Sequence, residues 1–206
     1  MAAATAAERL EYVLVVDFEA TCDDDRTFGP QEIIELPVVF VKMAGDGDGD
    51  GGPQIVDEFH RYIRPTSVPQ LTRFCTELTG IKQETVDAGM TIDEALDGLA
   101  EKIDEVLGAE LAGESTRWAF CTCGDWDLKT MLPKEVRNKE LRLAPALAAG
   151  VESWINIKHV YSAATGSRAR GMKGMLDAVG LELVGRHHSG IDDARNIAAL
   201  LIELWE

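Results

Sequence analysis

The sequence predicts a single α/β domain in which helices cover a β-sheet. Three strand-like segments come first, helices and one short strand follow, and the remaining segments are helical. This order is typical of layered α/β folds. A chain of 206 residues can enclose a substantial hydrophobic core, so one domain accommodates all of these elements. Its 46% hydrophobic and 27% charged residues are globular values, and they exclude a wholly disordered or collagen-like chain.

Three strands are predicted in the amino-terminal third. Residues 12–17 are apolar and β-branched, which is typical of a buried strand. A second strand is predicted over residues 33–43, where Pro37 indicates a sheet edge or a bulge. Residues 55–63 alternate less regularly and suit a half-exposed strand. The Gly/Asp-rich segment 44–53 would join two antiparallel neighbours.

The rest of the chain is expected to be mainly helical, with one short strand. Apolar residues recur three and four positions apart in the longest segments, as on one face of an amphipathic helix. No internal repeat and no second domain are expected. The predicted segments are helices over residues 69–79 and 91–107, a strand over 117–122, a helix over 126–138 interrupted by Pro133, and helices over 155–164, 172–180 and 191–205.

The Gly/Asp-rich segment also resembles the start of a calcium-binding loop. Asp46, Asp48 and Asp50 have the required spacing, and Asp57 stands where the closing acid would be. An EF-hand needs a helix on each side, whereas both flanks here are predicted strands, and Pro53 falls inside the would-be loop. We therefore interpret the segment as a flexible hairpin loop.

The charge of the chain is large and uneven. The formal net charge of −16 argues against a nonspecific binder of nucleic acid or anionic membranes. Residues 1–125 contain 26 acids and 9 bases, whereas residues 126–206 contain 10 acids and 11 bases. Residues 128–175 alone contain 9 bases against 3 acids. A local basic surface is therefore compatible with the acidic total.

From the sequence we expect no targeting or membrane segment at the amino terminus. It lacks the apolar core of ~7–15 residues that a signal peptide needs, and no run approaches the ~18 apolar residues of a membrane span. The four cysteines show no C-x-x-C pair, so neither a zinc site nor a disulfide framework is indicated. We expect a soluble intracellular protein, cytoplasmic or nuclear, that does not associate with membranes.

Two carboxylates stand at the end of the first predicted strand. Asp17 and Glu19 are two positions apart, so strand alternation directs both side chains to the same face. Like charges this close disfavour joint ionisation unless a cation neutralises them, and hard divalent cations prefer such oxygen ligands. The alternative is a pair of solvated side chains where the strand leaves the core.

Two further acidic clusters precede predicted helices. Asp125 and Asp127 follow a strand, and Asp192 and Asp193 begin the last helix, where an Asp can also serve as a helix cap. His188 precedes Asp193 by five residues, a spacing that can place an imidazole beside a metal-bound carboxylate. Histidine has the pKa to accept a proton from water near neutrality.

In this order, Asp-x-Glu, Trp-Asp and His-x-x-x-x-Asp resemble the motifs of the DEDDh 3′–5′ exonucleases. The sequence is more closely similar to the Eri-type exoribonucleases, the enhanced-RNAi or three-prime histone-mRNA exonuclease group. The resemblance covers about residues 12–205 and implies an RNase H-like mixed β-sheet flanked by α-helices. The segments that carry it are Val15–Cys22 (VVDFEATC), Glu32–Glu35 (EIIE), Phe74-Cys75 with Leu78–Ile81 (LTGI), Gly124–Asp127 (GDWD), Trp154–Ile157 (WINI) and His188–Asp193 (HSGIDD).

The resemblance also implies a domain division and a catalytic centre. Residues 12–206 would form the exonuclease domain, preceded by a flexible tail over residues 1–11 and containing the flexible loop at 44–53. Two Mg²⁺ ions, for which Mn²⁺ can substitute, would promote hydrolysis of the terminal phosphodiester. Their ligands would be four carboxylates and the general base a histidine: Asp17, Glu19, Asp127 and Asp193, with His188.

Other residues near these motifs receive supporting or rival roles. His187 is a rival for the general base, but it lies one position too far from Asp193. We interpret Asp125 and Asp192 as capping or supporting groups, and Glu32 and Glu35 as residues with packing or hydrogen-bonding roles.

Substrate binding would need stacking surfaces, contacts to the sugar and a basic track. Trp126 and Phe74 are expected to stack on the terminal base, with core packing as the alternative for Phe74. A hydrogen bond to the ribose 2′-hydroxyl would select RNA over DNA. The remaining expected contacts are backbone groups of Phe18 and Ala20 to the sugar, and the side chains of Arg168, Arg170 and Lys173 to the phosphate backbone.

The expected function is 3′–5′ exoribonuclease activity on single-stranded or short overhanging RNA 3′ ends, by a monomer. Nucleoside 5′-monophosphates would be released. We do not expect a SAP-type domain before the first strand, so recognition of a histone stem-loop is not expected. Two alternatives stay open: a DNA 3′–5′ exonuclease of the proofreading or repair type, and a non-catalytic regulatory binding protein on the same fold.

Overall fold

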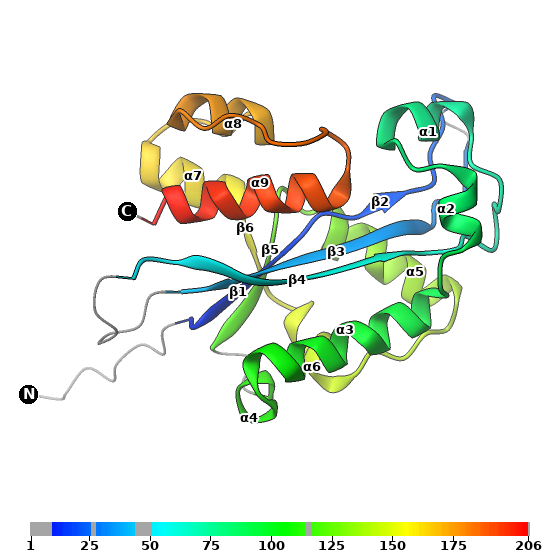
Figure 1. The fold of residues 1–206 in the computed structure, drawn as a ribbon, viewed down its shortest axis with the longest axis horizontal. Coiled ribbons are helices and arrows are strands. Elements are labelled where there is room, and N and C mark those ends of the chain that lie inside the picture. Colours follow the sequence, from blue (N-terminus) through cyan, green and yellow to red (C-terminus); the bar gives the residue numbers. More distant parts are fainter. Residues whose placement is uncertain (1–9, 26–27, 44–50, 114–116, 206) are drawn as a thin grey trace, which may run out of the picture.

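The computed structural model describes residues 10–25, 28–43, 51–113 and 117–205. Most of the predicted tail, and Asp46, Asp48 and Asp50 of the Gly/Asp-rich loop, lie outside these ranges. The described chain forms a mixed β-sheet with helices on both faces (Figure 1). The predicted α/β class is therefore confirmed.

The sheet is mixed because antiparallel and parallel ladders meet at its centre. The path runs β4–β3–β1–β5–β6, and β2 pairs with β3 beyond the end of β1. The β3 ladders to β1, β2 and β4 are antiparallel, whereas β1–β5 and β5–β6 are parallel. The strands are β1 (Tyr12–Val16), β2 (Glu19–Ala20), β3 (Ile33–Lys42), β4 (Gln54–Tyr62), β5 (Trp118–Thr122) and β6 (Trp154–Asn156).

Pro37 lies in a strand that is paired on both sides, so its interpretation as an edge or bulge residue is wrong. On one side it stands opposite His60 of β4. On the other side it falls between the last β1–β3 pair, Val16–Val38, and the first β2–β3 pair, Glu19–Glu35. A residue without an N–H is tolerated where the neighbouring ladder is interrupted. The same interruption lets the chain turn at Asp17.

The helices form two layers and one cap at the end of the sheet. α7, α8 and α9 cover one face, α3, α4 and α6 cover the other, and α1 and α2 lie at the end of the sheet near β2 (Figure 1). The helices are α1 (Arg73–Thr79), α2 (Gln83–Asp87), α3 (Ile92–Leu107), α4 (Ala109–Ala112), the π-helical η1 (Trp126–Met131), α5 (Leu132–Asn138), α6 (Pro145–Gly150), α7 (Ile157–Thr165), α8 (Met172–Val179) and α9 (Gly190–Glu203).

Strand alternation divides the core between these layers. In β1, Leu14 and Val16 pack toward the cluster that contains the α3 residues, whereas Val13 and Val15 pack toward the α9 residues. All four side chains are at most 1% exposed. A strand buried on both faces reads as a continuous apolar run, which explains why the sequence predicted it correctly.

Three predicted helix boundaries needed correction. The helix predicted from residue 69 begins at Arg73, because the Thr72 Oγ1 caps it by accepting the Cys75 N–H at 3.0 Å. The helix predicted over 126–138 with an interruption at Pro133 is divided slightly earlier, between η1 and α5, and Pro133 stands in the first turn of α5. The helix predicted from residue 155 begins as β6 and becomes helical only at Ile157.

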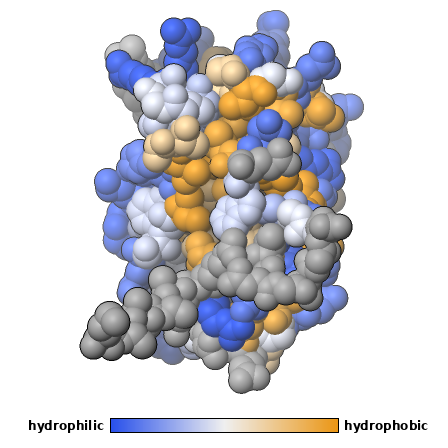
Figure 2. Space-filling model, turned by 90° about the vertical axis from the view of Figure 1, so that its left-hand side faces the viewer, coloured by the Kyte–Doolittle hydropathy of each residue, from blue (hydrophilic) through white to orange (hydrophobic). Residues whose placement is uncertain are grey.

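In the described part of the chain, no helix combines the length and the hydropathy needed to cross a bilayer. Figure 2 shows the end of the molecule that carries the carboxyl terminus, where a band of hydrophobic residues runs between hydrophilic flanks. The carboxyl terminus and β2 lie at opposite ends of the molecule (Figure 1). β2 therefore lies away from this hydrophobic band.

Candidate active site

Four carboxylates approach one another where β1 ends and α9 begins. Asp17 follows β1, Glu19 opens β2, and Asp193 lies in the first turn of α9. One oxygen from each of these three side chains lies within 4.8 Å of the other two. The structure thus brings together residues that are up to 176 positions apart in the sequence. This confirms the expected proximity of the first, second and fourth carboxylates.

The third carboxylate joins the cluster through the backbone of the turn after β1. Asp127 is 5% exposed, and its Oδ1 accepts the Phe18 N–H at 2.9 Å. Phe18 stands between the first two carboxylates, and its ring is buried in the core. Asp127 therefore holds in place the turn that presents Asp17 and Glu19.

Asp193 has one satisfied and one unsatisfied oxygen. Its Oδ2 accepts a 2.9 Å hydrogen bond from the backbone N–H of His188. Its Oδ1 is buried and, among the described residues, has no hydrogen-bond partner. A buried carboxylate oxygen without a partner is costly, and a bound cation would satisfy it.

A glycine allows α9 to approach the end of β1 closely. A Cβ at Gly190 would lie 2.6 Å from the Asp17 carbonyl oxygen and 3.2 Å from the Glu35 Cδ. Neither neighbour can move freely, because one is backbone and the other is a buried side chain. A side chain at position 190 would therefore push Asp193 away from Asp17.

The electrostatics of the cluster disfavour four ionised carboxylates in the absence of a cation. Burial and the charges of Asp127 and Asp193 raise the pKa of Asp17 well above its usual value. Burial and the Glu35 carboxylate raise the pKa of Glu19 to about 9. Burial also raises the pKa of Asp127, to about 6. Divalent cations would reverse this balance, because they stabilise the ionised form of each ligand.

Two histidines stand beside Asp193. Ligand atoms of His187, His188 and Asp193 lie within 4.8 Å of one another. The two rings are stacked, with centroids 4.0 Å apart, and the Nε2 of His187 lies 3.9 Å from the Asp193 Oδ2. Burial and the neighbouring His187 and Arg186 charges lower the pKa of His188, which keeps its imidazole neutral near pH 7. The sequence spacing alone had not indicated that His187 also reaches Asp193.

Glu35 connects β3 to the start of α9. Its Oε2 accepts the Gly190 N–H at 3.0 Å, and its Oε1 accepts the Ile191 N–H at 3.1 Å. The Nε2 of His60 lies 2.8 Å from the same Oε1. These contacts confirm the predicted hydrogen-bonding role and show its target, the helix turn that carries Asp193.

Glu32 connects β3 to the segment before α1. Its carboxylate accepts the N–H groups of Thr66, Ser67 and Val68 at 2.8–2.9 Å. Lys139 adds an ion pair at 2.9 Å. The predicted hydrogen-bonding role of Glu32 is therefore confirmed. The contacts of Glu32 lie outside the carboxylate cluster.

The other two acidic residues stabilise loops. Asp192 accepts the Arg186 N–H at 2.9 Å and so holds the loop that carries the two histidines. Asp125 accepts a hydrogen bond from the Asn156 Nδ2 at 3.0 Å. In this way Asp125 ties the turn before η1 to the junction of β6 and α7, and its side chain makes no capping hydrogen bond.

Lys158 is a residue of this site that the sequence analysis did not single out. It lies in the first turn of α7, where the Asn156 side chain accepts its N–H. A Cβ at Gly124 would lie 3.3 Å from the Lys158 Nζ, and the ammonium charge acts to lower the pKa of Asp127. The neighbouring motif Trp154–Ile157 could have indicated it, because that motif positions the start of α7.

Two aromatic side chains near the cluster are exposed. Phe74 is 38% exposed and Trp126 is 39% exposed, so the core-packing alternative for Phe74 is wrong. The Thr72 Oγ1 donates to the Cys22 carbonyl at 2.6 Å, which ties the start of α1 to the chain just after β2. Stacking by these rings stays a prediction.

The other predicted substrate contacts are placed differently. The Phe18 N–H is occupied by Asp127, and Ala20 is buried, with its carbonyl facing the Cys75 thiol. Arg168 and Arg170 line one pocket, whereas Lys173 pairs with Asp177 at 3.3 Å and does not line it.

Known proteins are similar to this chain in sequence and in fold. A family model described as an exonuclease, RNase T, matches residues 14–201. The solved nuclease domain of 3′hExo, a DEDDh family member bound to rAMP, superposes with a TM-score of 0.76 at 30% identity, covering 94% of this chain and 90% of that one. The chain belongs to the DEDDh exonuclease family. The predicted RNase H-like fold is thereby confirmed.

Named relatives place this DEDDh exonuclease-family chain near the Eri group. It is 42% identical to human ERI1 exoribonuclease 3, and the match covers 94% of this chain and 53% of the human protein. It is 36% identical to the 3′-5′ exonuclease Snipper of Drosophila melanogaster, over 94% of the chain and 69% of that protein. The chain spans about half the length of the human relative. Exonucleases of this family depend on divalent metal ions, and the acidic cluster described above is suited to hold them.

Proposed function

We propose that this chain is a Mg²⁺-dependent 3′–5′ exoribonuclease. Its substrates would be single-stranded RNA 3′ ends or short 3′ overhangs, and its products nucleoside 5′-monophosphates. The observation that carries the proposal is the convergence of Asp17, Glu19 and Asp193 beside His188. The relatives support the substrate class, because one is an exoribonuclease by name and the solved 3′hExo domain is bound to rAMP.

The carboxylates fit two divalent ions. Asp17, Glu19, Asp127 and Asp193 would hold Mg²⁺, with Mn²⁺ as a substitute, and the unpartnered Asp193 Oδ1 is an oxygen that such an ion would satisfy. Asp127 and Asp193 are buried, whereas Asp17 and Glu19 are half-buried. Burial raises the pKa of all four carboxyls, as is typical of functional sites. When bound, the ions supply positive charge to the phosphate oxygens and lower the pKa of water at the site.

His188 would accept the proton of the attacking water. The water oxygen forms a bond to the terminal phosphorus as the bond to the 3′ oxygen of the preceding nucleotide breaks. A neutral imidazole is required for this step, and the lowered pKa of His188 provides it. The hydrogen bond from the backbone N–H of His188 to Asp193 holds His188 at the cluster.

The neighbouring side chains would bind the terminal nucleotide. Trp126 and Phe74 present exposed rings on which the base can stack, an interaction worth ~1–3 kcal/mol per base. Phe18 and Ala20, on either side of Glu19, are assigned no contact to the sugar, because both side chains are buried and the Phe18 N–H is already bound to Asp127. The Lys158 ammonium, next to the Gly124 turn, would contact a phosphate oxygen.

The direct test is digestion of matched RNA and DNA oligonucleotides that carry a 5′ label. With Mg²⁺, we expect RNA to shorten one nucleotide at a time from its 3′ end, faster than DNA, and EDTA to stop the reaction. Faster digestion of DNA would favour the proofreading or repair alternative. No digestion of either polymer with Mg²⁺ or Mn²⁺ would favour the non-catalytic binding protein and contradict the proposal.

A further inference from the structure

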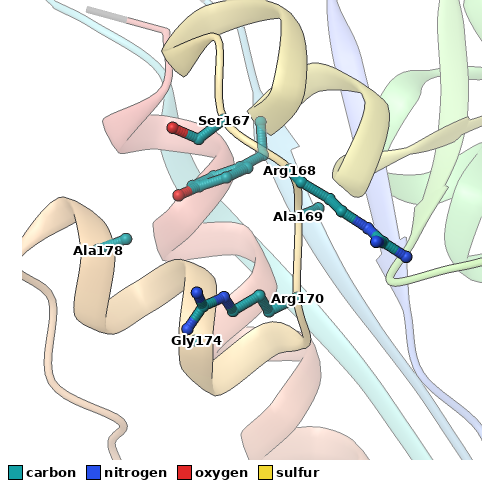
Figure 3. A pocket seen from close by; sticks show the side chains of 7 residues that line it. Ser167, Arg168, Ala169, Arg170, Gly174 and Ala178 are labelled. Carbon is teal, nitrogen blue, oxygen red and sulfur yellow. The ribbon is translucent and has the colours of Figure 1, made fainter.

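A second site lies between α7 and α8. The pocket encloses about 720 Å³ and is lined by Tyr161 of α7, by the loop that follows, and by Gly174 and Ala178 of α8. Among the residues that the structure describes, no acid lines it. Figure 3 shows the Arg170 guanidinium beside Gly174, whereas the Arg168 side chain points away from it. The two cations therefore lie on different sides of the loop.

The charge of this pocket is not neutralised from within the protein. Both arginines are exposed, and in the part of the chain that the structure describes neither has a carboxylate partner. Lys173, one turn away, is paired with Asp177 at 3.3 Å. In a chain of net charge −16, two arginines on one loop, neither with a carboxylate partner among the described residues, form a local anion-binding surface.

Small residues of α8 keep the pocket open. A Cβ at Gly174 would lie 3.2 Å from the Arg170 Cβ, so glycine allows the arginine stem to lie against the helix. Ala178 is one turn further along the same face of α8. Tyr161, which is 5% exposed, gives the opposite wall a fixed position.

The pocket is connected to the carboxylate cluster along α7. Lys158 lies next to Gly124 at the start of this helix. Tyr161 is three residues further, on the same side of α7 and about 4.5 Å along its axis. A nucleic-acid strand whose 3′ end reaches the carboxylates can thus continue along α7 toward the pocket.

We propose that the α7–α8 pocket binds backbone phosphates of RNA upstream of the terminal nucleotide. This proposal rests on the proposed exoribonuclease function and adds to it a second point of contact, formed by Arg170 in the pocket and by Arg168 on the other side of the same loop. Arginine is suited to this task, because its planar guanidinium binds phosphate through two parallel hydrogen bonds. The paired Lys173 is not part of the site.

The test compares a long and a minimal substrate. The variant R168A/R170A is measured against a 20-nucleotide RNA and against the 4-nitrophenyl ester of thymidine 5′-monophosphate, which reaches only the carboxylate cluster. We expect KM for the RNA to rise at least tenfold, while kcat/KM for the ester stays unchanged. The slope of log KM against log salt concentration should fall by about 1.4, because two contacts to single-stranded phosphates are lost.

A matched control removes the same charge elsewhere. Arg61 of β4 and Arg137 of α5 are exposed and lie away from α7 and α8. R61A/R137A should therefore leave the RNA KM, the kcat/KM for the ester and the salt slope unchanged.

An unchanged RNA KM in R168A/R170A would overturn the proposal, as would an equal loss on the ester. If the wild type hydrolyses neither substrate, the proposed function fails. The pocket is then judged by RNA binding in EDTA, where an unchanged affinity in R168A/R170A overturns it.

Discussion

The Oδ1 of Asp127 accepts a 2.9 Å hydrogen bond from the backbone N–H of Phe18, 109 residues earlier in the chain. The third carboxylate of the cluster thus positions the turn that carries the first two. This contact makes the site a single unit, since displacement of η1 would move Asp17 and Glu19 together.

Replacing Glu19 with Gln should abolish nuclease activity without destabilising the fold. Burial and the Glu35 and Asp193 carboxylates raise the pKa of Glu19 to about 9, so its ionised form is unfavourable when no cation is present. In EDTA we expect the Tm of E19Q to equal or exceed that of the wild type. Added Mn²⁺ should raise the Tm of the wild type more than that of E19Q. E101Q, an exposed change on α3, serves as the control, and an E19Q protein with wild-type activity would refute the assignment.

Glu35 should act on catalysis through the position of α9. Its two oxygens accept the Gly190 and Ile191 N–H groups, and Gln offers only one acceptor, so E35Q leaves one buried N–H facing an amide NH₂. We expect a loss of about 1–3 kcal/mol in the free energy of unfolding. We also expect weaker Mn²⁺ binding, measured by calorimetry, because Asp193 moves with the helix. Loss of stability with unchanged Mn²⁺ affinity would show that Glu35 serves the fold alone.

Lys158 should bind phosphate rather than base. We expect K158M to weaken binding of adenosine 5′-monophosphate roughly tenfold and to leave the much weaker binding of adenosine unchanged. K158R should retain most of the affinity, because the positive charge remains. K134M on α5 is the matched control, and equal losses for nucleotide and nucleoside in K158M would contradict the assignment.

The contacts of Glu32 predict a defined acid sensitivity. Burial alone would raise the pKa of Glu32, but the hydrogen bonds from Lys139, Thr66 and Val68 outweigh it and lower the pKa to about 2. The folded state thus binds this proton less readily than the unfolded state, whose value is near 4.5. The stabilisation, on the order of 3 kcal/mol, is complete above about pH 4.5 and is lost as the pH falls toward 2.

Urea unfolding between pH 7 and pH 2.5 measures this contribution. E32Q should have a lower free energy of unfolding at pH 7 than the wild type and should lose less of it in acid. E101Q should follow the wild-type curve. If E32Q and the wild type lose stability in parallel, the ion pair with Lys139 does not account for the acid sensitivity.

The sequence predicted the parts of the molecule that depend on local pattern. Burial of β1 on both faces makes its sequence continuously apolar, and burial of one face of α3 makes apolar residues recur at helical spacing. Both patterns can be recognised in the sequence. The four carboxylates and His188 stand in short motifs at the ends of elements, and the resemblance to the DEDDh exonucleases implied their roles. β2 and β6, of two and three residues, are too short to show any period.

The features that were missed depend on contacts between distant segments. Lys158 reaches the site only because β6 pairs with β5 and places the start of α7 beside Gly124. His187 reaches Asp193 because the histidine at position 188 adopts a positive φ of 66°, a conformation that sequence spacing does not indicate. Pro37 was misread because the interruption between β1 and β2 belongs to the neighbouring strand.

The central claim is that the Asp17, Glu19, Asp127 and Asp193 cluster, with His188, hydrolyses RNA from its 3′ end. The most direct measurement is release of labelled mononucleotide from a 3′-labelled single-stranded RNA by the wild type, D193N, H188A and the exposed control D97N in Mg²⁺. The wild type and D97N should release the nucleotide at equal rates, and D193N and H188A should be at least 100-fold slower while their circular dichroism spectra remain unchanged. Wild-type release by both D193N and H188A would contradict the account.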